Sequence, residues 1–346
     1  MEPTVAVVIL NWNGKHLLEK FLPVVLNNTP QATIYVADNC STDNSVQFLS
    51  ESYPEIKILR NDTNCGFAEG YNKALSTLNE DYFVLLNSDV EVTPNWLTPM
   101  VALLESDPAI ACCQPKIKDY HNKNYFEYAG AAGGFIDRFG YPFCKGRIFT
   151  FIEEDLSQYE KTDEIFWASG ACMLIRANLY KECGGLDSSF FAHMEEIDLC
   201  WRLINRGYKI YYTPYSTVYH IGGSTLSKVN SQKTYLNFRN SLWVLIKNLH
   251  TNELLTTVFV RLVLDGIAGI KFLLEGKPMH CIAIIRAHFY CYISLRQVFR
   301  KRKNVTHKTL KNLPGVYPKS IVYDFFVKKK KRYKDLEIPD STSFSS

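Results

Sequence analysis

The sequence lacks the patterns that mark zinc-binding, disulfide-rich and secreted proteins. It has 10 cysteines, but no two of them have the CxxC spacing of a zinc or redox motif. We therefore expect most of them to be buried thiols in a reducing compartment. The N-terminus has no basic segment ahead of a long apolar core, so we expect no secretory signal. Internal repeats are also missing.

Basic residues are scarce in the front of the chain. Residues 241–346 hold 19 Lys and Arg against 7 Asp and Glu, a net charge of +12. Because the whole chain has 39 against 35, residues 1–240 hold 20 against 28, a net charge of −8. An acidic front argues against a nucleic-acid binder, which needs a basic surface around its main site. A hydrophobic content of 47% over 346 residues predicts a globular protein with one large domain and an appendage, or two domains.

The front half predicts an α/β fold with a mostly parallel sheet and helices on both faces. Apolar runs typical of buried strands alternate with segments of helical spacing. We expect strands at 5–12, 33–37, 56–59, 82–87 and 109–114, and helices at 17–28, 45–52, 67–78 and 94–106. Pro23 should interrupt the first helix. Ligands of such sheets bind beyond the carboxyl ends of the strands.

The middle of the chain is less regular. Residues 115–165 are rich in aromatic residues and glycine, and they predict irregular hairpins and a loop. We expect a strand at 166–176, helices at 177–183 and 195–207, and a strand, a turn and a second strand at 208–223.

Polar side chains follow four consecutive predicted strands. Asn11, Asp38, Asn61 and the 87–89 segment each lie just past a strand end, so they should meet at one edge of the sheet. Turns are polar in any protein, and Asp38 could simply cap the next helix through an Asx turn. The recurrence at four strands favours a binding site. Asp89 fits a divalent cation that needs only one or two protein carboxylates because phosphates complete its shell.

Three acids and one histidine complete the candidate chemistry. Glu195, Glu196 and Asp198 cluster at the start of a predicted helix, either as a solvated first turn or as the source of a general base. His220 follows a strand and precedes a glycine pair. Alone it would be a core or turn histidine, but beside Asp89 it could be the nitrogen ligand of a mostly oxygen metal site.

Seven segments occur together in one order: "VVILNWNG", "YVADNCSTDNS", "NCGFAEGYN", "LLNSDV", "GACMLIRANLYKECGGLDSSFF", "EEIDLCWRL" and "VYHIGGS". In order and spacing they resemble family 2 inverting glycosyltransferases, in particular the rhamnosyltransferase-like branch, over about residues 4–245. The resemblance implies the GT-A fold, with a nucleotide-binding α/β half joined to an acceptor half. It also implies sugar transfer with inversion at the anomeric carbon, in cell-surface glycan synthesis.

The resemblance implies a role for each segment. Nucleotide-sugar binding falls to the sheet edge and to the loop over the nucleotide, namely Asn11, Asn13, Asp38, Asn39, Asn64, Gly66, Gly70, Asn72, Asn87, Ser88 and Asp89. Asp38 would bind the pyrimidine base. Asp89 and His220 would hold Mg²⁺ or Mn²⁺ on the diphosphate, although Asn87 stands where the family has its first acid. Glu196 would be the base, with Glu195 and Asp198 beside it; the family's usual residue there is Asp, one methylene shorter.

The implied donor is a dTDP- or UDP-sugar, with rhamnose the first choice of sugar. The implied acceptor is a glycan, either a polysaccharide or one linked to a lipid such as a polyprenyl diphosphate. Two other classes compete. A sugar nucleotidyltransferase would need a glycine-rich basic loop after the first strand, where this sequence has only Gly14 and Lys15. A non-catalytic membrane-surface scaffold would not need the acids and histidine named above.

The rear predicts a helical extension that either lies on a membrane surface, which the basic charge favours, or packs on the catalytic domain. Residues 254–274 form an apolar run whose polar members share one arc of about 120°, namely Thr257, Arg261, Asp265, Lys271 and, just beyond it, Glu275. A second apolar segment, 279–295, precedes basic runs at 300–303 and 328–332. We expect a catalytic domain at 1–245, a basic membrane-associating extension at 246–335 and a disordered tail at 336–346. The protein would be peripheral, on the cytoplasmic face of the inner or plasma membrane.

Overall fold

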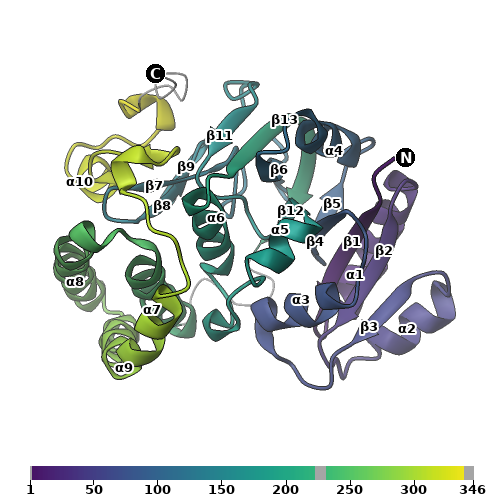
Figure 1. Cartoon of the computed structure of the whole chain (residues 1–346), viewed down its shortest axis with the longest axis horizontal. Coiled ribbons are helices and arrows are strands. Elements are labelled where there is room, and N and C mark those ends of the chain that lie inside the picture. Colours follow the sequence, from purple (N-terminus) through teal and green to yellow (C-terminus); the bar gives the residue numbers. More distant parts are fainter. Residues whose placement is uncertain (1, 223–230, 339–346) are drawn as a thin grey trace.

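The computed structural model describes residues 2–222 and 231–338. Its main sheet has the strand order β11-β13-β6-β12-β4-β1-β2-β3, with β5 paired to β13 (Figure 1). Its strands are β1 (Val5–Asn11), β2 (Thr33–Asp38), β3 (Lys57–Arg60), β4 (Tyr82–Asn87), β5 (Val90–Val92), β6 (Ile110–Asp119), β11 (Asp163–Ile165), β12 (Cys172–Arg176) and β13 (Lys209–His220). β1 is parallel to β2 and β4, whereas β12 is antiparallel to β4 and β6. The predicted α/β class is confirmed. The sheet is mixed rather than mostly parallel, because four of its strand pairings are parallel and four are antiparallel.

Helices bury both faces of this sheet. They are α1 (Lys15–Asn28), α2 (Ser45–Ser52), α3 (Gly66–Ser76), α4 (Leu97–Ser106), α5 (Ala177–Glu182) and α6 (Glu195–Asn205). Val5, Val7 and Ile9 of β1 pack into the core that α1 and α4 cover, while Ala6 and Val8 pack into the core of α3 and α6. Because each side chain of β1 meets an apolar layer, the strand reads as a continuous apolar run without alternation.

Residues 115–165 are more ordered than predicted. They contribute four short strands of a second sheet, β7 (Gly134–Asp137), β8 (Pro142–Cys144), β9 (Arg147–Ile148) and β10 (Phe151–Ile152). Its order is β10-β9-β8-β7-β14, so its last strand, β14 (Val316–Tyr317), comes from the rear of the chain. The antiparallel pairs β7–β8 and β9–β10 are hairpins, as predicted. Strands of two to four residues are too short to show a period of two, which explains why the sheet itself was not predicted.

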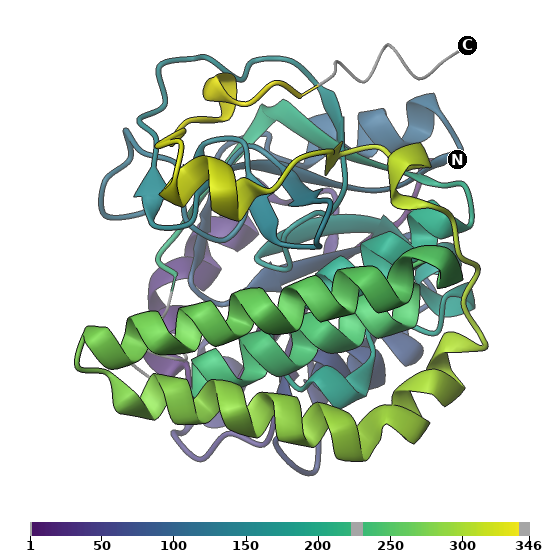
Figure 2. The same ribbon diagram turned by 90° about the vertical axis from the view of Figure 1, so that its left-hand side faces the viewer.

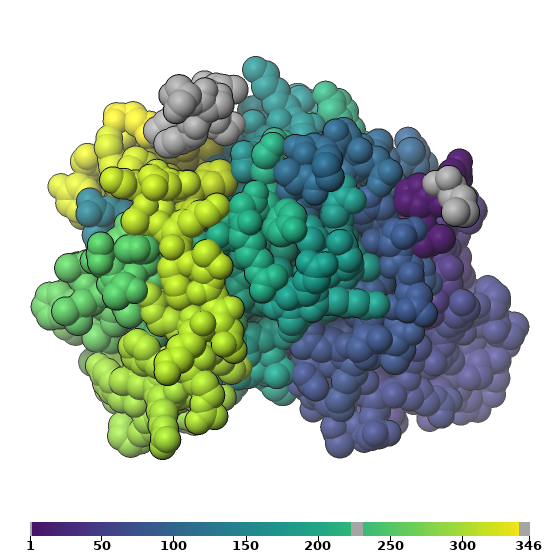
Figure 3. Space-filling view, in the orientation of Figure 1, coloured from purple at the N-terminus to yellow at the C-terminus, as the bar shows by residue number. Residues whose placement is uncertain are grey.

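Three long helices form the rear. α7 (Ser231–Asn248) lies behind an antiparallel hairpin of α8 (Thr251–Leu274) and α9 (Pro278–Arg302) (Figure 2). After α9 the chain climbs beside α5 and α6 before it reaches α10 (Ile321–Phe326), as a continuous yellow-green band in Figure 3. In the two described ranges, no helix combines the length and the apolar character that crossing a bilayer requires.

Three local predictions were wrong. α1 continues through Pro23, which lies on its exposed side, where a carbonyl that loses its partner can bond to water. The expected strand, turn and strand are one strand, β13, with a register irregularity between Thr213 and Thr217. The expected strand at 166–176 begins only at Cys172, because the N–H groups of residues 166 and 167 bond to Gly134 beside the second sheet.

Two further predictions concern the cysteines and the tail. All ten cysteines are free, as expected for thiols, and most are buried. Of the tail predicted at 336–346, residues 339–346 lie outside the described part. Leu336, the first residue of the predicted tail, is buried against the core, so the tail is not disordered at its start.

Candidate active site

The ends of β1 and β2 form a polar cluster at the carboxyl edge of the main sheet. Nδ2 of Asn11 donates to Oδ1 of Asp38 (3.2 Å) and to Oγ of Ser41 (3.1 Å). The N–H of Ser41 donates to the second carboxylate oxygen of Asp38 at 3.0 Å, so Asp38 does stabilise its own turn. Oδ1 of Asn11 is buried and has no hydrogen-bond partner among the described residues. Such an acceptor is costly unless a ligand donates to it.

A second layer of asparagines fixes the loop in front of α3. Nδ2 of Asn39 donates to Oδ1 of Asn64 (2.9 Å) and to the carbonyl of Gly66 (3.0 Å). Gly66 has a φ of +81°, and a Cβ there would lie 2.6 Å from the ring of Phe191. Only glycine fits this position. The loop therefore joins the edge of β2 to the segment that precedes α6.

Three other predicted residues lie at the same edge. Asn13, with a φ of +50°, accepts from the N–H of Thr42 at 2.7 Å and so latches the β1 loop to the β2 loop. A Cβ on Gly70 would lie 3.3 Å from Nδ2 of Asn39, so glycine lets α3 approach closely. Oγ of Ser88 lies 3.7 Å from where a Cβ on Gly14 would stand.

The end of β4 and β13 bring the candidate metal ligands together. Oδ1 of Asp89 lies 3.1 Å from Nε2 of His220, and Nδ2 of Asn87 lies 3.3 Å from the same nitrogen. The antiparallel pairing of His220 with Val90 sets this geometry. Within residues 2–222 and 231–338, no three or more His, Cys, Asp or Glu side chains are grouped to hold a metal. Asp89 and His220 therefore fit a cation whose remaining ligands come from phosphates and water.

Glu127 backs His220 from the other side. Its Oε2 lies 3.3 Å from Nδ1 of His220, and both residues are buried. Burial alone would lower the pKa of His220, but the carboxylates of Glu127 and Asp89 outweigh it and raise the pKa to about 10. Gly222, with a φ of +70°, makes room, since a Cβ there would lie 2.5 Å from Oε1 of Glu127. A carboxylate in this place fixes the ring orientation and tautomer of a metal-ligating histidine.

Two carboxylates at the start of α6 each have one oxygen without a partner. Oε2 of Glu195 and Oε2 of Glu196 are buried, and neither has a hydrogen-bond partner among the described residues. Burial and the Glu196 carboxylate raise the pKa of Glu195 well above its usual range. Burial raises the pKa of Glu196 to about 7. A carboxylate that titrates near neutral pH is suited to take a proton from a hydroxyl group.

Gly170 places Glu196 beside the sheet edge. A Cβ on Gly170 would lie 3.9 Å from Cβ of Glu196, and the carbonyl of Ala171 accepts from the N–H of Asn87 at 3.0 Å. The segment of Gly170 and Ala171 thus has Glu196 on one side and the end of β4 on the other. One chain segment separates the base candidate from the Asn87–Asp89 turn.

The loop in front of α6 is strained. Phe191, His193 and Met194 have φ values of +65°, +70° and +75°, in the left-handed region that non-glycine residues rarely adopt. Residues held this way cost about 1–3 kcal/mol each and cluster at functional sites. The strain lies directly before Glu195 and Glu196, so the loop sets where these carboxylates point.

Two side chains of α7 hold this loop in place. Nδ2 of Asn240 donates to three of its carbonyl oxygens, at distances of 2.7–3.2 Å. Nη2 of Arg239 donates to two carbonyls at its start, at 2.8 and 3.2 Å. α7 is therefore part of the site rather than of a separate appendage.

Residues 6–184, just over half of the chain, match the family model described as glycosyl transferase family 2. The chain belongs to this family. Its relatives include the N-acetylglucosaminyl-diphospho-decaprenol L-rhamnosyltransferase of Mycobacterium tuberculosis, which is 26% identical over 238 residues, covering 64% of this chain and 76% of the relative. The predicted family 2, rhamnosyltransferase-like character of the glycosyltransferase is confirmed.

Solved structures show the fold of this glycosyltransferase. GalNAc-T7 with UDP, GalNAc and Mn²⁺ superposes with a TM-score of 0.57 at 20% identity, over 72% of this chain and 48% of that chain. The mannosyltransferase PcManGT from Pyrobaculum calidifontis, in complex with GDP-Man and Mn²⁺, gives 0.52 at 13% identity, over 88% and 85%. The predicted GT-A fold is confirmed.

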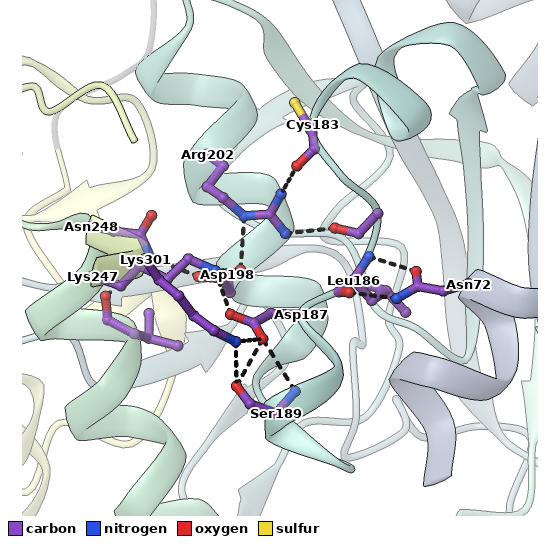
Figure 4. A network of polar contacts seen from close by, with 12 residues as sticks. Asn72, Cys183, Leu186, Asp187, Ser189, Asp198, Arg202, Lys247, Asn248 and Lys301 are labelled. Atoms are coloured by element: carbon purple, nitrogen blue, oxygen red, sulfur yellow. Dashed lines mark hydrogen bonds and ion pairs between the residues drawn. The ribbon is translucent and has the colours of Figure 1, made fainter. Parts of the chain in front are cut away.

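Asp198, the third acid of the family 2 motif, does not face the glutamates. Its Oδ2 accepts from Nε of Arg202 (2.8 Å) and Nζ of Lys247 (2.9 Å), and its Oδ1 accepts from Asn248 (2.8 Å) (Figure 4). Burial alone would raise the pKa of Asp198, but Lys247 and Arg202 outweigh it and lower the pKa. With both oxygens occupied and no exposure, Asp198 holds α6 to α7.

Asn72 was predicted to bind the nucleotide sugar, but its side chain lies away from the sheet edge. Its Nδ2 donates to the carbonyl of Leu186 (2.7 Å), and its Oδ1 accepts from the N–H of Leu186 (3.0 Å) and from the hydroxyl of Tyr180 (2.7 Å) (Figure 4). The amide of Asn72 thus ties α3 to the loop after α5. It does not join the asparagine cluster at the sheet edge.

Three residues of the site escaped sequence reasoning. Glu127 stands in the aromatic and glycine-rich stretch, where no local pattern marks it. Arg239 and Asn240 are adjacent polar residues inside an otherwise apolar helical run, and both are buried. That pair was the available signal, because buried polar side chains need partners.

Proposed function

We propose that this glycosyltransferase moves a sugar from a nucleoside diphosphate sugar to an acceptor hydroxyl in a single displacement that inverts the anomeric carbon. The observation that carries the proposal is the buried Oε2 atom of Glu196, which has no hydrogen-bond partner among the described residues, on a carboxylate with a pKa raised to about 7 and one chain segment from the end of β4. In that place it would take the acceptor proton as the new glycosidic bond forms.

The donor nucleotide would lie along the carboxyl ends of β1 and β2. Asp38 would accept from the pyrimidine base, and the free Oδ1 of Asn11 would accept from a donor group on the nucleotide. The Asn39–Asn64 pair holds the loop that would cover it. Trp12 is about half exposed, at 47%, beside this cluster, so it has a free ring face for an aromatic base.

Asp89 and His220 would hold a divalent cation, Mg²⁺ or Mn²⁺. The donor set supports this, since one carboxylate oxygen and one imidazole nitrogen lie 3.1 Å apart at the same edge. GalNAc-T7 and the mannosyltransferase PcManGT, which share this fold, were both solved with Mn²⁺. Such an ion supplies neutralisation of the charge that develops on the leaving diphosphate. Glu127 would keep Nε2 of His220 turned toward the ion.

Rhamnose from a dTDP- or UDP-linked donor is the sugar we propose. The Mycobacterium tuberculosis relative is named a rhamnosyltransferase that acts on a diphospho-decaprenol-linked N-acetylglucosamine. By analogy the acceptor would be a glycan on a polyprenyl diphosphate or a growing polysaccharide, made for the cell surface. All ten cysteines are free, which suits a catalytic half in the reducing cytoplasm.

The test begins with a thermal-shift screen of nucleotide sugars, in which a ligand at about 100 times its Kd should stabilise the protein by about 2.7 kcal/mol. The donor that binds is then incubated with lipid-linked acceptors. We expect free nucleoside diphosphate and a product of inverted configuration by NMR.

Pyrophosphate as the released product would instead indicate a sugar nucleotidyltransferase. Retained anomeric configuration would remove Glu196 from the role of sole base. A chain that binds no nucleotide sugar at all would leave the scaffold alternative standing.

A further inference from the structure

Three residues of the polar stripe of α8, Thr257, Arg261 and Asp265, are buried against the protein, whereas Lys271 and Glu275 at its C-terminal end are exposed. Arg261 is buried, donates to Oγ of Ser241 at 2.8 Å and stacks 3.8 Å from the ring centre of Tyr141. Asp265 is buried and lies within 3.2 Å of the Tyr141 hydroxyl and 3.1 Å of Nε2 of His288. The two charges in the middle of this apolar helix, Arg261 and Asp265, are thus buried and paired inside the fold.

The opposite side of the hairpin is apolar and exposed. On α8, Leu255, Phe259, Ile267 and Leu274 are 56–84% exposed, and on α9, Ile285 and Phe289 are 63% and 65% exposed. The exposed residues of α8 between Leu255 and Ile270 carry no charge. Figure 2 views the two helices side by side from outside. We call this surface the outer face of the α8–α9 hairpin. A contiguous apolar face of two helices marks an interaction surface.

The charges around the outer face select its partner. From Thr251 to Lys303, the exposed charged residues are six basic ones and a single acid, Glu275. Glu275 is itself paired with Lys271 and Lys277 at the hairpin turn. The other basic residues are Arg286, Arg296, Arg300 and Lys303. Apolar side chains framed by Lys and Arg are the pattern of helices that lie flat in a membrane interface with anionic lipids.

We propose that the outer face of the α8–α9 hairpin docks onto an anionic lipid bilayer. Both helices lie in the plane of the interface, with their apolar side chains at the boundary of headgroups and acyl chains. A flat orientation agrees with the spanning criterion, which no helix of the described residues meets. The docking itself needs no donor or acceptor; its use in reaching a lipid-linked acceptor rests on the proposed function.

The hairpin and the catalytic loop form one connected unit. Nε1 of Trp243 on α7 donates to Oγ of Ser294 on α9 at 3.2 Å, and Lys301 of α9 pairs with Asp187. α7 also carries Asn240, which holds the loop before Glu195. A bilayer under the outer face would therefore fix the orientation of the base relative to the membrane surface. An acceptor anchored in the same bilayer would meet the site from one direction.

The test is co-sedimentation of the whole chain with vesicles of equal parts phosphatidylcholine and phosphatidylglycerol, at low salt and without substrates. We expect I267D and I285D each to weaken partitioning about tenfold or more, because each places a charge where apolar burial drives binding. R296Q and R300Q should each cost about fivefold, and added salt should reduce wild-type binding.

L156D is the matched control. Leu156 is 73% exposed but lies in the loop between β10 and β11, so this change should leave vesicle binding unaltered. Wild-type protein that stays in the supernatant, or I267D and I285D that bind like wild type, would overturn the proposal. A stable dimer that I267D and I285D dissociate, with no vesicle binding, would assign the outer face to a second copy. Nucleotide-sugar binding is measured separately, so failure here leaves the proposed function untouched.

Discussion

The first turn of α6 holds buried carboxylates of two kinds. Glu195 and Glu196 each keep an oxygen without a hydrogen-bond partner among the described residues, and their pKa values are raised by burial. Asp198, two residues after Glu196 in the same turn, is paired on both oxygens, and its pKa is lowered. Three acids that look alike in sequence thus divide into two that can exchange protons and one that fastens helices.

The difference lies in what stands opposite each side chain. Oε2 of each glutamate has no hydrogen-bond partner among the described residues, and the segment beside Glu196 at Gly170 carries no charge. Asp198 faces Lys247 and Arg202. A buried carboxylate without a cation destabilises the fold, and proteins keep such groups mainly where chemistry needs them. Pairing is therefore a better guide to function here than charge.

The strongest test of the comparison is Glu196→Gln. It keeps the shape of the side chain but removes its basicity, so kcat should fall about 10²–10⁴-fold, with little change in donor binding. Because the folded state raises the pKa of Glu196 from 4.5 to about 7, ionisation of this group lowers stability as pH rises from about 4.5 to about 7, and the loss is complete above that. The variant should thus be at least as stable as wild type at pH 8, by urea unfolding. Turnover like that of wild type would move the role of base to Glu195.

Lys247→Met tests the paired kind of carboxylate. It removes one cation from both Asp198 and Asp187, which are buried, and should lower the free energy of unfolding by about 3 kcal/mol. Since the pKa values of both acids are lowered in the fold, their contribution is present near neutral pH and is lost as pH falls below about 4. The control Lys15→Met, at an exposed pair with Glu19, should change stability by less than about 0.5 kcal/mol.

Asn240→Ala sharpens the comparison from the side of the loop. The carbonyls of Ala192 and His193 would lose the Asn240 donor, whereas that of Phe190 would keep Arg239. The left-handed loop would then no longer hold Glu196 in register. We expect kcat to fall about 10–100-fold, as for small misplacements of a catalytic group, while the donor Kd stays within about twofold. Asn252→Ala, at an exposed position on α8, is the control. Equal losses in kcat and donor affinity would indicate general unfolding instead.

The pH profile tests the raised pKa directly. If Glu196 is the base, the single-turnover rate should rise with pH up to about 7 and then level off. Below that value it should fall about tenfold per pH unit, since only the ionised carboxylate accepts a proton. A rate that is flat between pH 5 and pH 8 would contradict the assignment.

Much of the proposed nucleotide site at the carboxyl edge of the sheet could be predicted, because an apolar run that turns polar marks the end of a strand. The helix at 45–52 and the strand at 82–87 have the predicted bounds, and Asn11, Asp38 and Asp89 lie at the edge expected for them. The roles of Asp198 and Asn72 were not readable, because each depends on a partner far away in the chain. Lys247 is 49 residues beyond Asp198, and Leu186 is 114 beyond Asn72.

The rear shows a different limit. Periodicity located one polar stripe on α8 correctly but could not tell which way it faces. Arg261 and Asp265 turn inward because Tyr141, from the aromatic-rich stretch, and His288 of α9 satisfy them there. A stripe of charged residues on a helix is usually assumed to face the solvent. Here long-range partners bury the middle of the stripe, so the apolar side of the helix is the one left exposed to interact.

The last strand of the second sheet is synthesised near the end of translation. β14 pairs with β7 but is synthesised long after it. The N–H of Ile321 donates to Oδ2 of Asp137 in β7 at 2.9 Å. At the usual synthesis rate of about 5–20 residues per second, the β7 edge waits roughly 10–40 s on the ribosome for its neighbour. An open strand edge is a template for aggregation during that interval. Expressed fragments that stop before Gly315 should therefore pellet even though they hold every residue of the proposed nucleotide site, whereas full-length chains gain the protecting strand as they are released.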